Sequence, residues 1–129
     1  MKEAKQGVGA LGEDAAAKYL KKNHYRIVER NYTSGKNEID IIAENREFLV
    51  FVEVKSRTHS EDTIARFGRA CEAVDARKQR CLLAAARAYC AQNTTKKKIR
   101  MDVVEVYFQN ADTPVLHSIH HMPDAFRIE

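Results

Sequence analysis

Three ionisable residues lie within apolar, strand-like sequence near the middle of the chain. Asp40 stands in the segment 38–43 (Glu-Ile-Asp-Ile-Ile-Ala), and Glu53 and Lys55 stand in the segment 48–56 (Phe-Leu-Val-Phe-Val-Glu-Val-Lys-Ser). An unpaired charge in apolar surroundings costs several kcal/mol or changes its protonation state. Two carboxylates and a lysine kept in such a setting are the residue types that a metal-dependent nuclease requires.

The chemistry of this set follows from its oxygen donors. Asp40 and Glu53 would repel each other without a cation between them, and hard carboxylate oxygens favour Mg²⁺ or Mn²⁺ with water in the remaining positions. Such an ion acidifies a water molecule and stabilises charge on a phosphate, while Lys55 would position or deprotonate that water. Arg57, further along the same segment, could bind a flanking phosphate. The competing interpretation is an exposed hairpin face on which Glu53 pairs with Lys55 or Arg57, and such surface pairs contribute little stability.

Whether the acids meet depends on the register of the predicted hairpin. Residues i and i+2 of a strand share a face, so Glu53 and Lys55 project together. A loop of two or of four residues would in either case place Asp40 opposite Phe51 and Glu38 opposite Glu53. Asp40 and Glu53 would then be diagonal neighbours, about 7–8 Å apart in the backbone. A three-residue loop would turn one strand over and separate them.

A helix is predicted from Gly9 to Asn23, because apolar side chains recur there on one broad arc. Glu13 falls at the edge of that arc, on the side of Leu20. One interpretation is a first-turn acid that the helix dipole favours. The other is a functional carboxylate near the core face, and the helical pattern alone leaves both open.

A second, Ala-rich helix is predicted from Ala73 to Ala91. Lys78 interrupts its apolar stripe, either as a lysine whose charged end reaches solvent or as a phosphate contact near the carboxylates. Arg77 and Arg80 lie towards other faces, where they could follow a nucleic-acid backbone or simply be solvated.

The remaining elements are strands. We predict them at Tyr25–Tyr32 and Lys98–Phe108, with an additional short edge strand at Val115–His121. The order α-β-β-β-α-β, with that extra strand, indicates an α/β fold in which helices flank a mixed central sheet. Residues 1–8 are expected to be flexible, and residues 58–70, which are polar and aperiodic, are expected to form a mobile loop.

Length and composition define the broad class. The 129 residues suit one domain spanning 1–129. The formal charge of +4 permits nucleic-acid binding without requiring it. No membrane helix and no signal-peptide pattern are found, so a cytoplasmic location is expected. Cys71, Cys81 and Cys90 are expected to be reduced packing residues, and the late histidines are expected to be structural.

The combination of segments resembles the small bacterial YraN-type family, which has a restriction-endonuclease-like fold and is related to archaeal Holliday junction resolvases. The resemblance rests on several short motifs spread along the chain: Gly12-Glu13, Glu29-Arg30-Asn31-Tyr32, Glu38-Ile39-Asp40-Ile41-Ile42, Val52-Glu53-Val54-Lys55-Ser56-Arg57, Phe67-Gly68, Lys78-Gln79 and Asp102-Val103-Val104.

The resemblance implies a restriction-endonuclease-like PD-(D/E)xK core. Asp40 would match the motif aspartate, and Glu53 with Lys55 the (D/E)xK pair. Glu13 would match the first-helix glutamate that approaches the metal, and Lys78 a lysine of the second helix. The implied catalytic set is thus Glu13, Asp40, Glu53 and Lys55, with the three acids as metal ligands.

The expected function is a Mg²⁺- or Mn²⁺-dependent endonuclease that hydrolyses phosphodiester bonds, with branched DNA as the substrate suggested by the related resolvases. Arg57, Lys78, Arg77 and Arg80 are the expected nucleic-acid contacts. A homodimer is expected by analogy with junction-cutting relatives. The alternative is a nucleic-acid-binding module of the same fold without turnover, and a third interpretation is a protein-interaction domain whose carboxylates are structural.

Overall fold

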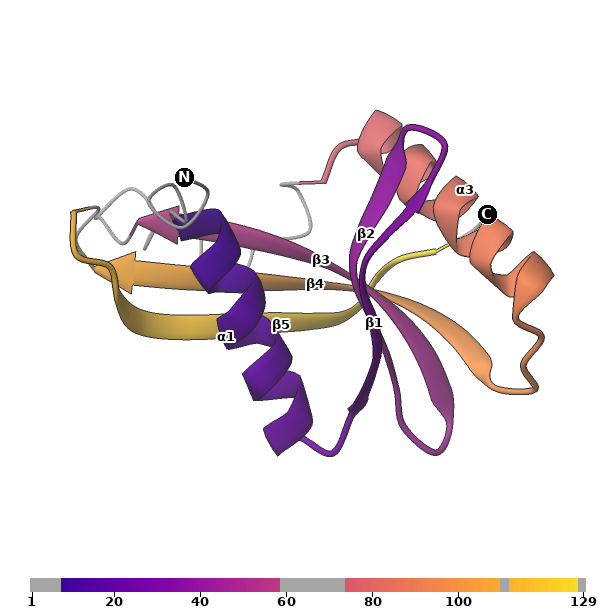
Figure 1. The fold of residues 1–129 in the computed structure, drawn as a ribbon, viewed down its shortest axis with the longest axis horizontal. Helices are drawn as coiled ribbons and strands as arrows, with labels where there is room; N and C mark the ends of the chain where they lie inside the picture. Colours follow the sequence, from indigo (N-terminus) through magenta and orange to yellow (C-terminus); the bar gives the residue numbers. More distant parts are fainter. Residues whose placement is uncertain (1–7, 59–73, 110–111, 128–129) are drawn as a thin grey trace.

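The computed structural model describes residues 8–58, 74–109 and 112–127. These residues form two helices and five strands in the predicted order, with the extra strand at the end (Figure 1). The bounds are α1 Val8–Lys22, β1 Arg26–Ser34, β2 Asn37–Glu44, β3 Phe48–Thr58, α3 Ala76–Gln92, β4 Lys98–Gln109 and β5 Val115–Phe126. The predicted flexible start and mobile loop lie outside the described residues, except that Val8 begins α1 and Thr58 ends β3.

The five strands form one mixed sheet in the order β1-β2-β3-β4-β5. Neighbouring strands are antiparallel except β3 and β4, which run parallel from Phe48 beside Lys98 to Thr58 beside Phe108. Parallel neighbours need a crossover connection, and α3 lies in the segment that joins them. The predicted mixed α/β class is therefore confirmed. The edge strand β5 reaches Phe126, well beyond the predicted end at His121.

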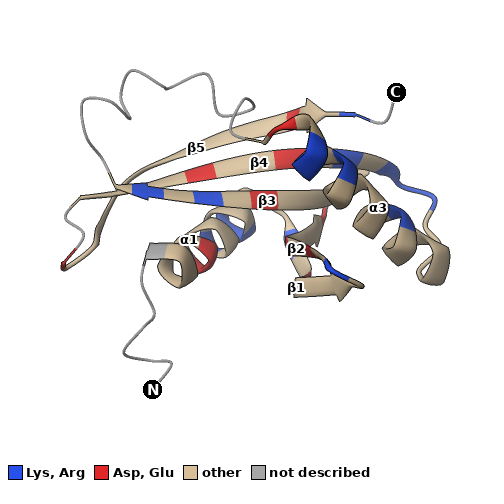
Figure 2. Cartoon of the chain, turned by 90° about the horizontal axis from the view of Figure 1, so that it is seen from above, with Lys and Arg blue, Asp and Glu red and all other residues tan. Residues whose placement is uncertain are grey.

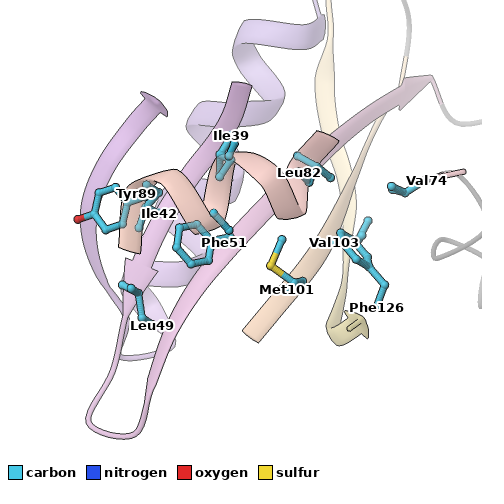
Figure 3. Packing of buried hydrophobic residues seen from close by; sticks show 12 residues of the cluster. Ile39, Ile42, Leu49, Phe51, Val74, Leu82, Tyr89, Met101, Val103 and Phe126 are labelled. Atoms are coloured by element: carbon cyan, nitrogen blue, oxygen red, sulfur yellow. The ribbon is translucent and has the colours of Figure 1, made fainter. Parts of the chain in front are cut away.

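Each face of the sheet packs against one helix. Along β3 the side chains alternate, so Val50 and Val52 join the cluster under α1, whereas Leu49 and Phe51 join the cluster under α3. Figure 3 shows the second cluster, in which Leu82 and Tyr89 of α3 lie over the sheet; its buried members also include Ile39, Ile42, Val74, Met101, Val103 and Phe126. The predicted separation of the two faces of β3 is confirmed.

The second helix begins three residues later than predicted, at Ala76 rather than Ala73. Asp75 has an extended backbone, and its carboxylate accepts a hydrogen bond from the backbone N–H of Lys78 at 2.8 Å. This contact caps one of the N–H groups that a helix start leaves without a partner. The Ala-rich composition masked that boundary, because alanine continues the helical pattern on both sides of the cap.

The register between β2 and β3 differs from the prediction by two residues. Glu44 lies opposite Leu49 and Ile41 opposite Val52. The side chain of Asn45 accepts hydrogen bonds from the backbone N–H groups of Glu47 and Phe48, at 3.0 and 2.7 Å. With this Asn-centred turn the connection comprises residues 45–48, one residue later than the predicted four-residue loop at 44–47. Because the shift is even, it preserves the face on which each side chain lies.

Candidate functional site

The first helix approaches the sheet most closely at Gly12. A Cβ atom added there would lie 2.9 Å from Cβ of Ser56 in β3 and closer still to its hydroxyl. The absence of a side chain therefore lets α1 pack directly on β3. The close approach brings the next residue, Glu13, to the end of the sheet at which Asp40 and Glu53 lie.

Asp40 lies where the pairing of β2 and β3 ends. The ladder stops at Ile41 and Val52, and one further step in the same register would set Asp40 opposite Glu53. Instead, Oδ2 of Asp40 accepts a hydrogen bond from the backbone N–H of Val54 at 2.8 Å. The carboxylate thus takes the place of a backbone acceptor and fixes its own position between the strands.

The environment of Asp40 disfavours its negative charge. The pKa of Asp40 is raised to about 7, first by burial and then by the nearby charges of Glu53 and Glu13, against the opposing effect of the Val54 N–H. Burial and the charge of Glu53, the two largest causes, are those expected where carboxylates gather with little access to solvent. A divalent cation bound between the carboxylates would remove this repulsion.

Glu53 is buried, with only 5% of its surface exposed, and it is accompanied by two lysines. Nζ of Lys55 lies 3.2 Å from Oε2 of Glu53, and Nζ of Lys78 lies 3.8 Å from the same oxygen. Lys78 comes from the first turn of α3, so the helix cap at Asp75 places it over the carboxylate. The structure therefore places the ammonium group of Lys78 beside the acids, as the second of its two interpretations requires.

Glu13 lies within electrostatic reach of the pair but is also tied to Arg30. Nη2 of Arg30 is 3.7 Å from Oε1 of Glu13 and 2.9 Å from Oδ1 of Asp14. Burial raises the pKa of Glu13, Arg30 opposes that change, and the charge of Glu38 adds to it. Glu38, which had no predicted role, therefore lies within electrostatic range of Glu13.

The oxygen donors around Asp40 and Glu53 determine which metal ion could bind there. Within the described ranges, no three His, Cys, Asp or Glu side chains are already grouped as ligands of one ion. Two carboxylates, Asp40 and Glu53, do converge, and Oδ1 of Asp40 is not engaged by Val54. Mg²⁺ usually takes only one or two carboxylates and keeps several waters. The oxygen donors present are therefore compatible with Mg²⁺ or Mn²⁺.

Arg57 is held by a buried acid that the sequence analysis missed. Nε of Arg57 donates to Oε2 of Glu105 at 2.8 Å, and the hydroxyl of Tyr107 donates to Oε1 of the same carboxylate at 2.6 Å. Glu105 is 2% exposed. The parallel register sets Arg57 beside Tyr107 on the face that carries Lys55. The i, i+2 spacing of Glu105 and Tyr107 was visible in the sequence, but their pairing with Arg57 required the strand order.

The cations of α3 extend from this site across the surface. Arg77 and Lys78 line a cleft of about 550 Å³ together with the β1–β2 turn; the other lining residues are Lys36, Asn37, Glu38, Lys55, Asp75 and Cys81. Arg80 lies one turn further along and is exposed. In Figure 2 the acidic segments of β2, β3 and β4 are flanked by basic segments along α3 and at one end of β3.

A second buried ionic cluster lies on the other side of the sheet. Asp102 is fully buried and accepts two hydrogen bonds from Arg100, at 2.9 and 2.8 Å, and one from the backbone N–H of Asp124 at 2.9 Å. Nε2 of His121 lies 2.7 Å from Oδ2 of Asp102, and Nδ1 of His121 lies 3.3 Å from the hydroxyl of Tyr19. The cluster joins β4, β5 and α1, so His121 has the structural place predicted for it.

Two further predictions concern thiols and membranes. Cys81 and Cys90 are both free thiols, as expected, whereas Cys71 lies outside the described residues. Neither described helix offers a stretch long and apolar enough to cross a lipid bilayer.

Comparison with known proteins assigns the chain to a family. Residues 12–106 match the model of the uncharacterised protein family UPF0102. A UPF0102 protein of Caldanaerobacter subterraneus is 40% identical over 123 residues, which cover 95% of this chain and 96% of that protein. One from Clostridium beijerinckii is 36% identical over 129 residues, covering 99% of both chains. One from Trichlorobacter lovleyi is 40% identical over 123 residues, covering 94% of this chain and 91% of that protein. The chain therefore belongs to the UPF0102 family.

Proposed function

We propose that this protein is a metal-dependent endonuclease that hydrolyses phosphodiester bonds in DNA, with a restriction-endonuclease-like core. The observation that carries the proposal is the pair of partly buried carboxylates, Asp40 and Glu53, with two lysine ammonium groups on Glu53. A purely structural role for two adjacent acids would ordinarily be satisfied by pairing each with a cation. Here Asp40 has no cation at hydrogen-bonding distance within the described chain, and its environment raises its pKa.

Each residue has a distinct proposed role. Asp40 and Glu53 would hold Mg²⁺ or Mn²⁺, with Glu13 as an outer acid that could reach a metal-bound water. When bound, the ion would supply an acidified water and would offset negative charge on the phosphate. Lys55, whose Nζ lies 3.2 Å from Oε2 of Glu53, would donate a hydrogen bond to the metal-bound water and orient it. To accept the water's proton, Lys55 would first have to lose its own proton to solvent and act as the neutral amine. Lys78 would neutralise charge on the phosphate.

The same surface suits a nucleic-acid backbone. Arg77 and Lys78 line the cleft beside the acids, and Arg57 presents its remaining N–H groups after Glu105 takes Nε. Lys and Arg side chains of this kind supply sequence-independent affinity for phosphates. Branched DNA and a homodimer are the substrate form and the assembly that we propose by analogy with resolvases.

A second candidate function has its own observation. Glu13 is held by Arg30, and the described residues contain no group of three ready-made ligands. This arrangement favours a nucleic-acid-binding module that retains the fold without turnover. Salt-dependent DNA binding that is indifferent to divalent metal would support it over the nuclease.

The deciding experiment measures cleavage of a four-way junction, a flap and a linear duplex with Mg²⁺ or Mn²⁺. Wild-type protein should cut at least one of them only with metal, and Asp40→Asn and Glu53→Gln should each lower the rate about 10²-fold or more. Glu47→Gln is the matched control, because Glu47 is an exposed acid of the same hairpin. Calorimetry should detect Mn²⁺ binding by the wild type and by Glu47→Gln but not by Asp40→Asn. Absence of metal-dependent cutting on all three substrates, or cutting by Asp40→Asn at the wild-type rate, would exclude the nuclease.

A further inference from the structure

A second cavity lies on the other flank of α3, away from the carboxylates. Its volume is about 850 Å³, which is within the range of small-molecule sites. The apolar part of its lining includes Leu83 from α3, Met101 from β4 and Phe126 from β5, which belong to the cluster under α3. Phe48 also lines it, although this residue packs with the cluster under α1. Figure 3 labels Met101 and Phe126 in the buried cluster that also contains Leu82 of α3. No role in the proposed hydrolysis uses this cavity.

The charged lining of the cavity is mainly cationic. It contains Arg87, Lys98, Arg100 and Arg127 and one acid, Asp124. Lys98, Arg100 and Arg127 are paired with Glu47, Asp102 and Asp124, so Arg87 is the lining cation that pairs with no acid within the described chain. The guanidinium of Arg100 lies 4.7 Å from the centroid of the Phe48 ring. An aromatic ring covered on one side by a guanidinium, with the unpaired Arg87 in the same lining, suits a ligand that combines a planar ring with a negative charge.

An arginine stripe joins this cavity to the candidate site. Arg77 lines the cleft near Glu53, Arg87 lines the second cavity, and Arg80 lies between them. All three are exposed, and within the described chain none forms an ion pair with an acid. At 100° per residue they fall within an arc of about 80°, and Arg77 and Arg87 are separated by about 15 Å along the axis. A stacked strand rises about 3.4 Å per nucleotide and an unstacked strand covers more, so the stripe spans at most about four nucleotide steps.

We propose that the second cavity is a nucleobase pocket for a single-stranded segment whose phosphates follow the arginine stripe from the candidate site. The base would stack against Phe48 on the apolar lining, and its phosphate would meet Arg87 and Lys98 at the rim. The stripe would hold the backbone without reading its sequence. This inference rests on the nucleic-acid binding of the proposed function and names the substrate form: a strand with at least one unpaired base, separated from the cleavage site by the length of the arginine stripe.

The test compares two labelled strands of twelve residues by fluorescence anisotropy, in 50 mM salt with EDTA so that nothing is cut. One strand carries ordinary bases, and the other has the same phosphates with every base replaced by an abasic tetrahydrofuran unit. Wild-type protein should bind the base-bearing strand about tenfold or more tightly, the effect expected from stacking one base. Phe48→Leu keeps an apolar side chain but removes the ring, so it should lower this preference to about twofold while leaving the affinity for the abasic strand unchanged.

The arginine stripe is tested separately. Arg87→Gln should weaken the binding of both strands by the same factor, about threefold to tenfold, because it removes a phosphate contact. Lys21→Gln is the matched control, since Lys21 is an exposed cation of α1 away from the stripe, and it should change neither affinity by more than about twofold.

A further measurement keeps Phe48 unchanged, so its result does not depend on whether the Phe48→Leu variant folds. Cys90 lines the cavity and is a half-buried free thiol. In a Cys71→Ser/Cys81→Ser background, the base-bearing strand should slow alkylation of Cys90 about fivefold or more, and the abasic strand should not.

The outcomes separate the two proposals. Equal binding of both strands, with no protection of Cys90, would overturn the base pocket and leave the nuclease untouched. Base-dependent binding without metal-dependent cleavage would uphold the pocket and overturn only the nuclease. Binding of neither strand would overturn the pocket, while the cleavage assay on junction, flap and duplex DNA would still decide the nuclease. A change in oligomeric mass of Phe48→Leu with unchanged strand preference would show that the cavity receives a second copy of the chain, which would also overturn the pocket.

Discussion

The contact between Gly12 and Ser56 makes the position of Glu13 depend on a single missing side chain. In Gly12→Ala the new Cβ would lie 2.9 Å from Cβ of Ser56 and closer to its hydroxyl, which is nearer than carbon atoms approach without displacement. Either α1 or β3 must therefore move. Since Glu13 follows directly in the chain, we expect both the stability of the protein and the geometry of the acidic site to change.

The size of the effect can be separated from helix propensity. Overpacking of this kind typically costs about 1–3 kcal/mol, whereas alanine is favoured over glycine in a helix by about 1 kcal/mol. Gly9→Ala is the matched control, because a Cβ at Gly9, in the same helix, meets nothing within 4 Å. The difference between the two variants in the free energy of unfolding should isolate the clash, at about 1–3 kcal/mol.

The assay is urea denaturation of the wild type, the two glycine variants and the double variant Gly12→Ala/Ser56→Gly. The double variant removes the Ser56 side chain that the new Cβ meets, so it should recover most of the lost stability. Calorimetric Mn²⁺ affinity should fall in Gly12→Ala and not in Gly9→Ala. If the two glycine variants differ by less than about 0.5 kcal/mol, or if Ser56→Gly recovers nothing, the argument that this contact places α1 is wrong.

Three further predictions concern buried and capping acids. Burial alone would raise the pKa of Asp102, but hydrogen bonds from His121 and Arg100 outweigh it and lower that pKa below 3.8. Asp102→Asn should therefore lower the free energy of unfolding by about 3–5 kcal/mol at neutral pH, because it leaves Arg100 without its carboxylate. The difference from the wild type should shrink as the pH falls below 3.8 and through the lower pKa of Asp102 in the folded protein. Urea denaturation at pH 7 and at about pH 3 would check this. Glu105→Gln should lower the free energy of unfolding by about 1–3 kcal/mol, because the hydrogen bond to Arg57 loses its charged acceptor. The control Glu47→Gln should change it by less than about 0.5 kcal/mol. Equal effects of the two substitutions would contradict a stabilising role of the buried Glu105 carboxylate. Asp75→Ala should lower it by about 1 kcal/mol through loss of the cap, whereas Asp75→Asn should cost only a few tenths; hydrogen exchange of the first turn of α3 would show whether the loss is local.

Local patterns were sufficient for the elements and for their order. The β-branched and aromatic runs indicated the strands, and the helical repeat of apolar residues indicated α1 within one residue at each end. The period of two along β3 correctly separated Glu53 and Lys55 from Val52 and Val54. These predictions succeed because side-chain periodicity is a property of each element alone.

The errors came from interactions that periodicity does not describe. The start of α3 was set by the carboxylate of Asp75, and the hairpin register by the side chain of Asn45. Both are hydrogen bonds from a side chain to nearby backbone, which compete with the regular pattern. The prediction that Asp40 and Glu53 share a face survived because the register error was even.

The amino-acid pattern alone identifies the residues that could do chemistry, Asp40, Glu53 and Lys55 on one face of the predicted hairpin, and indicates that a mixed sheet carries them. Which other residues join them depends on the tertiary structure. Lys78 reaches Glu53 because α3 crosses back over the sheet, and Arg57 is tied to Glu105 because β4 runs parallel to β3. These contacts link residues far apart in the chain, so their geometry depends on strand order and helix packing, which no local pattern contains.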